Sequence, residues 1–158
     1  MRMHAAVLGL PLAAALLLAP ACRVEGQSQD AEDELRLELQ LRDAAGRTTR
    51  QLRRGEPLAF VLTVHNPAEE PRRLAFSSAK THDVIVSRAD GKEVWRLSDG
   101  LVYLQMLTEI VLPPRGSREL PARWDVPSDA EPGEYRAHGT VPAQANPLEA
   151  PAVTFTLE

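Results

Sequence analysis

The sequence has few of the residues that disulfide-held and nucleic-acid-binding proteins rely on. Its 158 residues include one cysteine, which cannot form an internal disulfide. Aromatic residues make up only 4% of the chain, so each is expected to anchor a core. Most lysine and arginine residues are interspersed with aspartate and glutamate, and the formal net charge is −4. Without a long basic run, nucleic acid is not an expected partner.

Patterns that mark common catalytic sites are also missing. The chain has no HExxH zinc pattern, no glycine-rich phosphate loop and no GxSxG nucleophile elbow. His82 and Asp83 are adjacent, but no second pair of ligands has a spacing suited to a metal. The sequence therefore predicts no cofactor, no metal and no enzymatic activity.

A long apolar run is found at the N-terminus. It extends from Ala5 to Ala19, follows Arg2 and is too short for a confident membrane span. Ala19-Pro20-Ala21 then provides the small-x-small pattern that signal peptidases require. Residues 1–21 are therefore predicted to be a signal peptide.

Cys22 follows this segment directly. Its position resembles a bacterial lipobox, in which the thiol receives a diacylglyceryl group and becomes the mature N-terminus, although Ala19 stands where leucine is usual. Residues 22–33 then form a polar, flexible tether. We expect an exported lipoprotein of the cell envelope, anchored to a membrane through Cys22. The alternative is ordinary cleavage, which leaves a secreted or periplasmic protein with an incidental thiol.

From Glu34 onward the sequence alternates between apolar and polar residues. Leu35, Leu37, Leu39 and Leu41 are separated by charged or amide side chains, and a period of two predicts a half-buried strand. Similar short runs recur about every ten residues, separated by turn residues. Residues 34–158 are predicted to form an all-β domain, an immunoglobulin-like antiparallel β-sandwich of about eight to nine strands. The later runs are 58–64, 74–76, 84–86, 94–97, 110–112, 117–126, 135–139 and 153–157.

Large aromatic side chains lie within these alternating runs. We assign them to the structural core, because a buried aromatic ring contributes much of a small core. A ligand-stacking role for the two tryptophans is the alternative. The predicted core aromatics are Phe60, Phe76, Trp95, Trp124 and Tyr135.

Several short motifs follow one another in a fixed order between Leu58 and Val141. They are Phe60-x-Leu62-x-Val64-x-Asn66, Phe76-Ser77-Ser78, His82-Asp83-Val84, Gly91-x-x-Val94-Trp95-Arg96-x-Ser98, Tyr103-x-Gln105, and the set Trp124, Gly133 and Tyr135. This ordered set resembles the BsuPI-type intracellular proteinase inhibitor family. The resemblance implies an immunoglobulin-like sandwich that inhibits serine proteinases of the subtilisin class.

The sequence departs from the family pattern in one turn and at its N-terminus. Ala79, Lys80, His82 and Val84 stand where the family has glycine, glutamine, tyrosine and phenylalanine. The predicted export signal is unexpected in a family named as intracellular.

Two loops are candidates for binding a protein partner. The first comprises Ser77, Ser78, Ala79, Lys80, Thr81, His82 and Asp83. The second runs from Ser98 to Met106 and is more apolar than a loop should be, because it contains Leu101, Tyr103, Leu104 and Met106. An inhibitor would offer an extended segment with a large apolar side chain to the proteinase pocket, which favours the second loop. The alternative is that these four side chains pack beneath the sandwich, with residues 101–107 forming a strand or one helical turn.

Two functions follow from these observations. The first is an exported, lipid-anchored binding protein that inhibits or regulates a subtilisin-like serine proteinase. The second is a surface-tethered immunoglobulin-like module that binds another envelope protein or polymer without inhibiting proteinases.

Overall fold

A computed structural model describes residues 33–158. The predicted signal peptide, Cys22 and most of the predicted tether lie outside the described residues. The described part contains eleven strands and no helix, and hence no helix that could cross a membrane. This confirms the prediction of an all-β domain with a sandwich architecture. Two strands beyond the predicted number, β2 (Gln51–Leu52) and β10 (Leu148–Glu149), have two residues each, too few to show an alternating pattern.

One layer of the sandwich is a three-stranded antiparallel sheet. Its strand order is β1 (Arg36–Arg42), β3 (Pro57–His65) and β8 (Ser117–Asp125). The central strand β3 turns every second side chain inward, and Leu58, Phe60, Leu62 and Val64 are completely buried. The period-two pattern of the sequence therefore defines the face of this sheet that meets the core.

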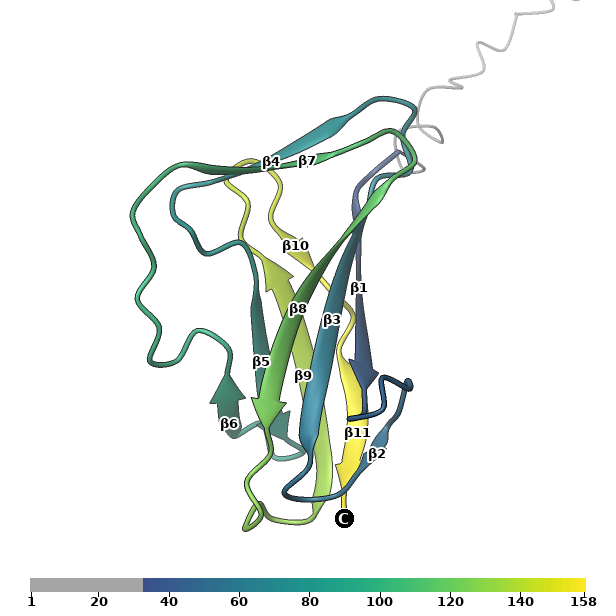
Figure 1. Ribbon diagram of the computed structural model, residues 1–158, viewed down its shortest axis with the longest axis vertical. Helices are drawn as coiled ribbons and strands as arrows, with labels where there is room; N and C mark the ends of the chain where they lie inside the picture. Colours follow the sequence, from purple (N-terminus) through teal and green to yellow (C-terminus); the bar gives the residue numbers. More distant parts are fainter. Residues whose placement is uncertain (1–32) are drawn as a thin grey trace, which may run out of the picture.

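The opposite layer is a larger sheet with the order β2 (Gln51–Leu52), β11 (Val153–Leu157), β9 (Gly133–Val141), β5 (Asp83–Arg88) and β6 (Glu93–Arg96). The short strand β10 (Leu148–Glu149) also pairs with β9. Figure 1 shows the two layers facing each other along the long axis of the molecule. On β9, Gly139 packs directly against Leu62 of the facing sheet. A Cβ atom there would lie 2.2 Å from Leu62 Cδ2, so only glycine fits without displacing the core.

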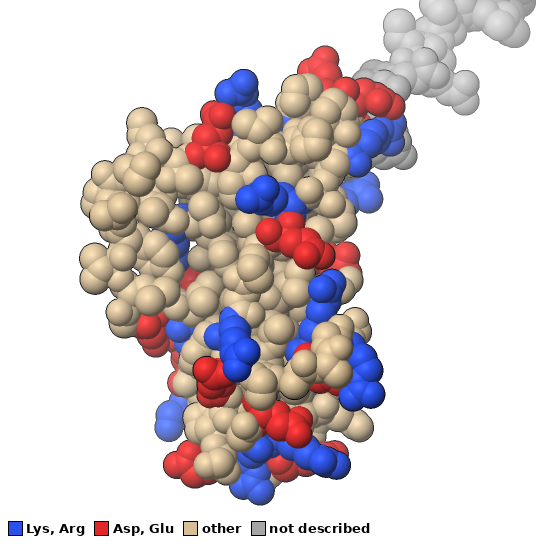
Figure 2. Space-filling model, in the orientation of Figure 1, with Lys and Arg blue, Asp and Glu red and all other residues tan. Residues whose placement is uncertain are grey.

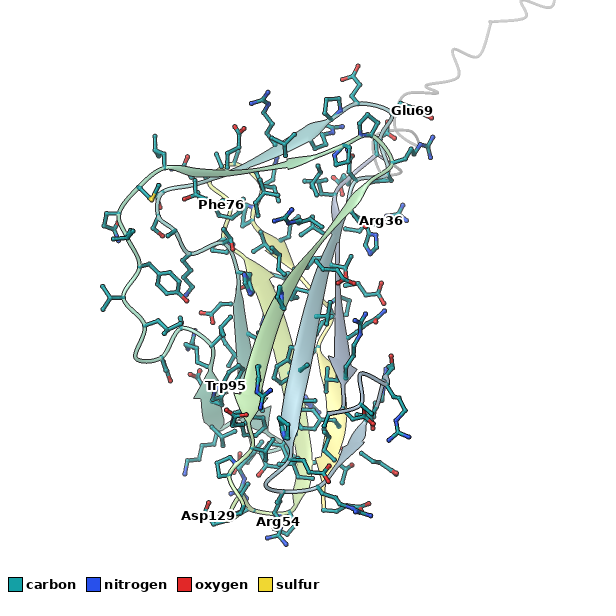
Figure 3. All side chains as sticks on the ribbon, viewed as in Figure 1. Arg36, Arg54, Glu69, Phe76, Trp95 and Asp129 are labelled. Atoms are coloured by element: carbon teal, nitrogen blue, oxygen red, sulfur yellow. The ribbon has the colours of Figure 1, made fainter. Side chains whose placement is uncertain are left out.

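Five aromatic rings contact one another in sequence through the core and link both sheets, with three pairs stacked and the Trp124–Tyr135 pair tilted. The centroid separations are 5.6 Å from Phe60 to Trp95, 5.9 Å from Trp95 to Trp124, 6.4 Å from Trp124 to Tyr135 and 5.8 Å from Tyr135 to Phe155. Of these rings, only Trp95, on the edge strand β6, is partly exposed (Figure 3). Phe76 is buried elsewhere in the core.

A two-stranded ribbon, β4 (Arg72–Phe76) paired with β7 (Thr108–Leu112), crosses one end of the sandwich (Figure 1). Leu74, Phe76 and Leu112 turn inward and close that end of the core. The buried Asn66 fixes the neighbouring turns, because its Nδ2 donates hydrogen bonds to the carbonyl oxygens of Glu70 and Pro113 at 2.8 and 2.9 Å. Beyond the Phe76–Thr108 pair the ribbon opens into two loops.

Candidate functional site

The two loops that leave the ribbon form one projecting unit, which we call the two-loop lobe. Its inner loop, residues 77–82, joins β4 to β5, and its outer loop, residues 97–107, joins β6 to β7. Strand pairing closes the lobe at both ends, through Phe76 with Thr108 and through Ile85 with Arg96. In Figure 1 the outer loop arches away from the sandwich on the left.

The inner and outer loops touch near the middle of the lobe. The Ala79 backbone N–H donates a hydrogen bond to the Leu104 carbonyl oxygen at 2.9 Å. Lys80 Nζ lies 6.0 Å from the centre of the Tyr103 ring, at the outer limit of a cation–π contact. The structure therefore brings together the two loops that the sequence singled out as separate candidates.

A buried carboxylate fixes the base of the lobe. The side chain of Asp83 is only 4% exposed, and its Oδ2 accepts hydrogen bonds from Lys80 Nζ at 2.5 Å and Ser98 Oγ at 2.7 Å. Its Oδ1 accepts from the backbone N–H groups of Val84 at 3.0 Å and Ser98 at 3.2 Å. Arg96 Nη1 lies 3.7 Å from Oδ2. One carboxylate thus links the end of the inner loop to the start of the outer loop.

The electrostatics of this contact favour the ionised carboxylate. Burial raises the pKa of Asp83, but hydrogen bonds from Lys80 and Ser98 and the charge of Lys80 outweigh it, so the pKa is below its usual value. Asp83 is consequently charged at neutral pH, and its hydrogen bonds are of the stronger, charge-assisted kind.

His82 connects the inner loop to the opposite sheet. Its Nε2 lies 3.0 Å from the carbonyl oxygen of Pro121 in β8, and Thr81 Oγ1 lies 3.1 Å from its Nδ1. A carbonyl only accepts, so Nε2 carries the proton and the neutral ring accepts at Nδ1 from the Thr81 hydroxyl. Burial lowers the pKa of His82 and outweighs the raising effect of the Pro121 hydrogen bond. These contacts give His82 a structural role in the lobe.

The remaining residues of the inner loop form its tight turn. Ser78 Oγ accepts a hydrogen bond from the Lys80 backbone N–H at 3.2 Å. Ser77 is exposed, whereas Ser78, Ala79, Lys80 and Thr81 are half-buried. The inner loop is therefore a support for the outer loop more than a surface of its own.

The outer loop exposes large apolar side chains. Their exposed fractions are 54% for Leu101, 98% for Val102, 70% for Leu104, 53% for Met106 and 80% for Leu107. The nine residues 100–108 contain no charged side chain. Figure 2 shows the corresponding projection on the left as a surface almost free of charge. An exposed apolar patch on a soluble domain commonly marks a site of protein interaction.

These exposures contradict the alternative in which the apolar side chains pack beneath the sandwich. Leu101, Leu104 and Met106 face solvent, and only Tyr103 is half-buried. Residues 101–107 form neither a strand nor a helical turn. They directly follow a turn in which Gly100 adopts a φ of +72°, in the left-handed region that favours glycine.

Sequence reasoning missed two of the exposed residues and one structural partner. Val102 and Leu107 are the most exposed apolar side chains of the lobe, and Ser98 is the partner of Asp83. For Val102 and Leu107, the sequence does contain a signal: the run without charged residues that follows the Asp99-Gly100 turn. No local pattern connects Ser98 with Asp83. Within residues 33–158 no group of three potential metal ligands comes together.

Comparisons with known proteins give a family and a fold. The model of the family described as "BsuPI: Intracellular proteinase inhibitor" matches residues 45–146, which include the whole two-loop lobe. No curated protein matches the chain in sequence.

The overall architecture resembles that of a solved domain. The C-terminal domain of wzt has 14% sequence identity and a TM-score of 0.53, covering 78% of this chain and 73% of that one. Spo0M, the sporulation control protein from Bacillus subtilis, has 10% identity and a TM-score of 0.49, with coverage of 78% and 49%. The alkylpurine DNA glycosylase AlkC from Pseudomonas fluorescens has 14% identity and a TM-score of 0.47, with coverage of 79% and 30%. At such identities, the likeness to the wzt domain concerns the fold alone.

Proposed function

The chain belongs to the BsuPI intracellular proteinase inhibitor family, and from this premise we propose that it inhibits a serine proteinase of the subtilisin class through the outer loop of the two-loop lobe. Membership of an inhibitor family points to a binding protein and away from an enzyme. The family match names neither the target proteinase nor the binding segment, and the proposal assigns both.

One observation carries the proposal: a charge-free apolar loop stands clear of the sandwich on a hydrogen-bonded base. Burying apolar side chains contributes about 25 cal/mol per Å² removed from water. Covering this loop with a partner would therefore contribute a large favourable free energy of binding. The inner loop fixes the outer loop before binding, through Asp83 and through Ala79 to Leu104. Such preorganisation reduces the entropy lost on association and is typical of proteinase inhibitors.

Titration of a subtilisin-type proteinase with the purified protein tests the proposal. We expect activity to fall in proportion to the inhibitor added until one equivalent is present. Leu101→Ser in the outer loop is expected to weaken inhibition about tenfold, since a large apolar contact is worth about 1–3 kcal/mol. Val111→Ser is the matched control, because Val111 is exposed to a similar extent, 51%, on β7 outside the lobe.

Full proteinase activity at excess inhibitor, across several enzymes of this class, would contradict the proposal. It would favour the second hypothesis, a module that binds another envelope protein or polymer.

We further propose that the protein acts outside the cytoplasm and is held to a membrane through lipid on Cys22. Support comes from the apolar N-terminal run and the small residues before Cys22. Acyl chains on the cysteine would anchor the protein firmly, because each buried methylene contributes about 0.8 kcal/mol. Mass spectrometry of the mature N-terminus is expected to show an acylated Cys22. An unmodified thiol or an uncleaved chain would contradict the anchor, and Cys22→Ala is the control that should release the protein from membranes.

A further inference from the structure

We infer that Val102 is the side chain that enters the primary specificity pocket of the target, and that the Val102–Tyr103 peptide bond is the one offered to the proteinase nucleophile. The inference rests on the proposed function and deepens it. Three properties of the outer loop lead to it: side-chain exposure, the free main-chain carbonyls and the way residues after this bond are held.

The first property is exposure. A side chain that fills a pocket of another protein must be free of contacts with its own. Val102 is 98% exposed, whereas Leu101 and Met106 lose about half of their surface to neighbouring residues. Val102 is thus the apolar side chain of the loop that a pocket can enclose most completely.

The second property is the hydrogen bonding of the main chain. The carbonyl that a serine attacks must be free, because its oxygen has to reach the donors of the oxyanion hole. The Leu104 carbonyl is already engaged, by Ala79 N at 2.9 Å and Met106 N at 3.0 Å. Thr108 Oγ1 donates to the Met106 carbonyl at 3.4 Å. These contacts disfavour the bonds after Leu104 and Met106.

The carbonyl of Val102 has no such engagement. Within the described part of the chain, no hydrogen bond reaches the carbonyl oxygens of Leu101, Val102 or Tyr103. Leu107 is also strongly exposed, but the residue after it, Thr108, is already paired with Phe76 in the ribbon. A proteinase cleft needs free main chain on both sides of the bond, so the ribbon disfavours Leu107.

The third property explains why the proteinase would be inhibited and would not simply digest the loop. Attack by the serine on the Val102 carbonyl carbon would form an ester and break the bond to the Tyr103 nitrogen, which takes the proton that the enzyme's base removed from the serine. The new amine belongs to Tyr103. The contact between Lys80 and the Tyr103 ring, and the hydrogen bond from the Ala79 N–H to the Leu104 carbonyl, hold it in place. The amine can then attack the ester, restore the peptide bond and return the proton to the serine. A tethered amine competes well with water because its effective concentration is high.

The nature of the side chain defines the class of target. Valine is apolar and branched at Cβ, so the matching pocket is apolar and of medium width. A carboxylate placed in such a pocket would lose its hydration without a partner. Inhibition should therefore be far more sensitive to charge at residue 102 than at other exposed positions of the loop.

The test compares Val102→Asp with Leu107→Asp in the full chain, measured as inhibition constants against subtilisin and two related serine proteinases. Both variants add one carboxylate to strongly exposed positions of the outer loop, and equal thermal melting curves will show that both fold. We expect Val102→Asp to raise the inhibition constant at least 100-fold and Leu107→Asp to raise it less than tenfold. Prolonged incubation of the unchanged protein with enzyme should yield a small fraction cleaved between residues 102 and 103, detected by mass spectrometry.

Each other outcome overturns a specific claim. Inhibition that survives Val102→Asp, or a cut at a different bond of the outer loop, would overturn the assignment while leaving the proposed function intact. A lack of inhibition by the unchanged protein would overturn the proposed function, and the assignment with it.

Discussion

The inner loop of the two-loop lobe is largely polar, half-buried and fixed by hydrogen bonds, whereas the outer loop is apolar, charge-free and exposed. The inner loop is followed directly by Asp83, the first residue of β5, whose carboxylate accepts hydrogen bonds from Lys80, Val84 and Ser98. The outer loop makes one backbone hydrogen bond to the inner loop, through Leu104, and projects five apolar side chains into solvent. The usual distribution of polar and apolar residues is reversed here, because the polar loop supports the structure and the apolar loop is left for a partner.

Removing the carboxylate of Asp83 is expected to give the largest change in stability. Asp83→Ala leaves Lys80 and the Ser98 hydroxyl without their buried acceptor, which should lower the free energy of unfolding by about 3 kcal/mol. Chemical denaturation of the variant and the unchanged protein measures the difference. Asp83→Asn is the matched control, since it keeps the shape and one acceptor oxygen and should lose less. A change below about 0.5 kcal/mol for Asp83→Ala would show that the inner loop does not depend on this carboxylate.

The pH dependence of stability should reveal the contribution of His82, a residue of the inner loop that hydrogen bonds fix in place. Burial lowers the pKa of His82 in the folded protein, so below about pH 6.5 the unfolded chain binds a proton that the folded protein does not. The contribution of neutral His82 to the free energy of unfolding is therefore complete above that pH. It is lost as the pH falls towards the pKa of His82 in the folded protein.

The melting temperature measured from pH 8 to pH 5 tests this expectation. The unchanged protein should lose more stability over this interval than His82→Gln, which keeps a donor for Pro121 and does not titrate. Because His65 and His138 are present in both proteins, the difference isolates His82. Parallel curves would contradict the assignment of a neutral, half-buried ring.

The smallest effect is expected in the outer loop. Leu107→Ser should change the free energy of unfolding by less than about 0.5 kcal/mol, because the Leu107 side chain is 80% exposed. The same denaturation measurement applies. A loss above about 1 kcal/mol would show that the outer loop packs against the sandwich, and the contrast between the two loops would then fail.

The sequence predicted the sandwich well because alternation is a local signal. Leu58, Phe60, Leu62 and Val64 all face the core as their spacing required. The lobe was harder to predict, since it depends on contacts between distant positions. Ala79 and Leu104 meet only because the β4–β7 ribbon and the β5–β6 pair close the two loops at both ends.

The outer loop shows why apolar residues alone were ambiguous. Leu101, Tyr103 and Leu104 suit a strand, a helical turn or a binding loop equally well, and local spacing cannot decide whether a neighbouring layer covers them. Val102 is smaller than the leucine, tyrosine and methionine side chains around it, and side-chain size does not reveal exposure. The charge-free run after Asp99-Gly100 marks the loop, but its exposure follows from the tertiary structure.

The stacking of Trp95 on Trp124 gives the molecule a built-in optical reporter. The two indoles lie 5.9 Å apart, one on β6 and the other on β8, and the outer loop begins two residues after Trp95. Electronic transitions of rings at this separation couple, so their near-ultraviolet circular dichroism reports whether the edge strand β6 remains packed against the core. Because the chain contains no other tryptophan, a shift of the lobe on engagement with a partner would be visible in the unlabelled protein.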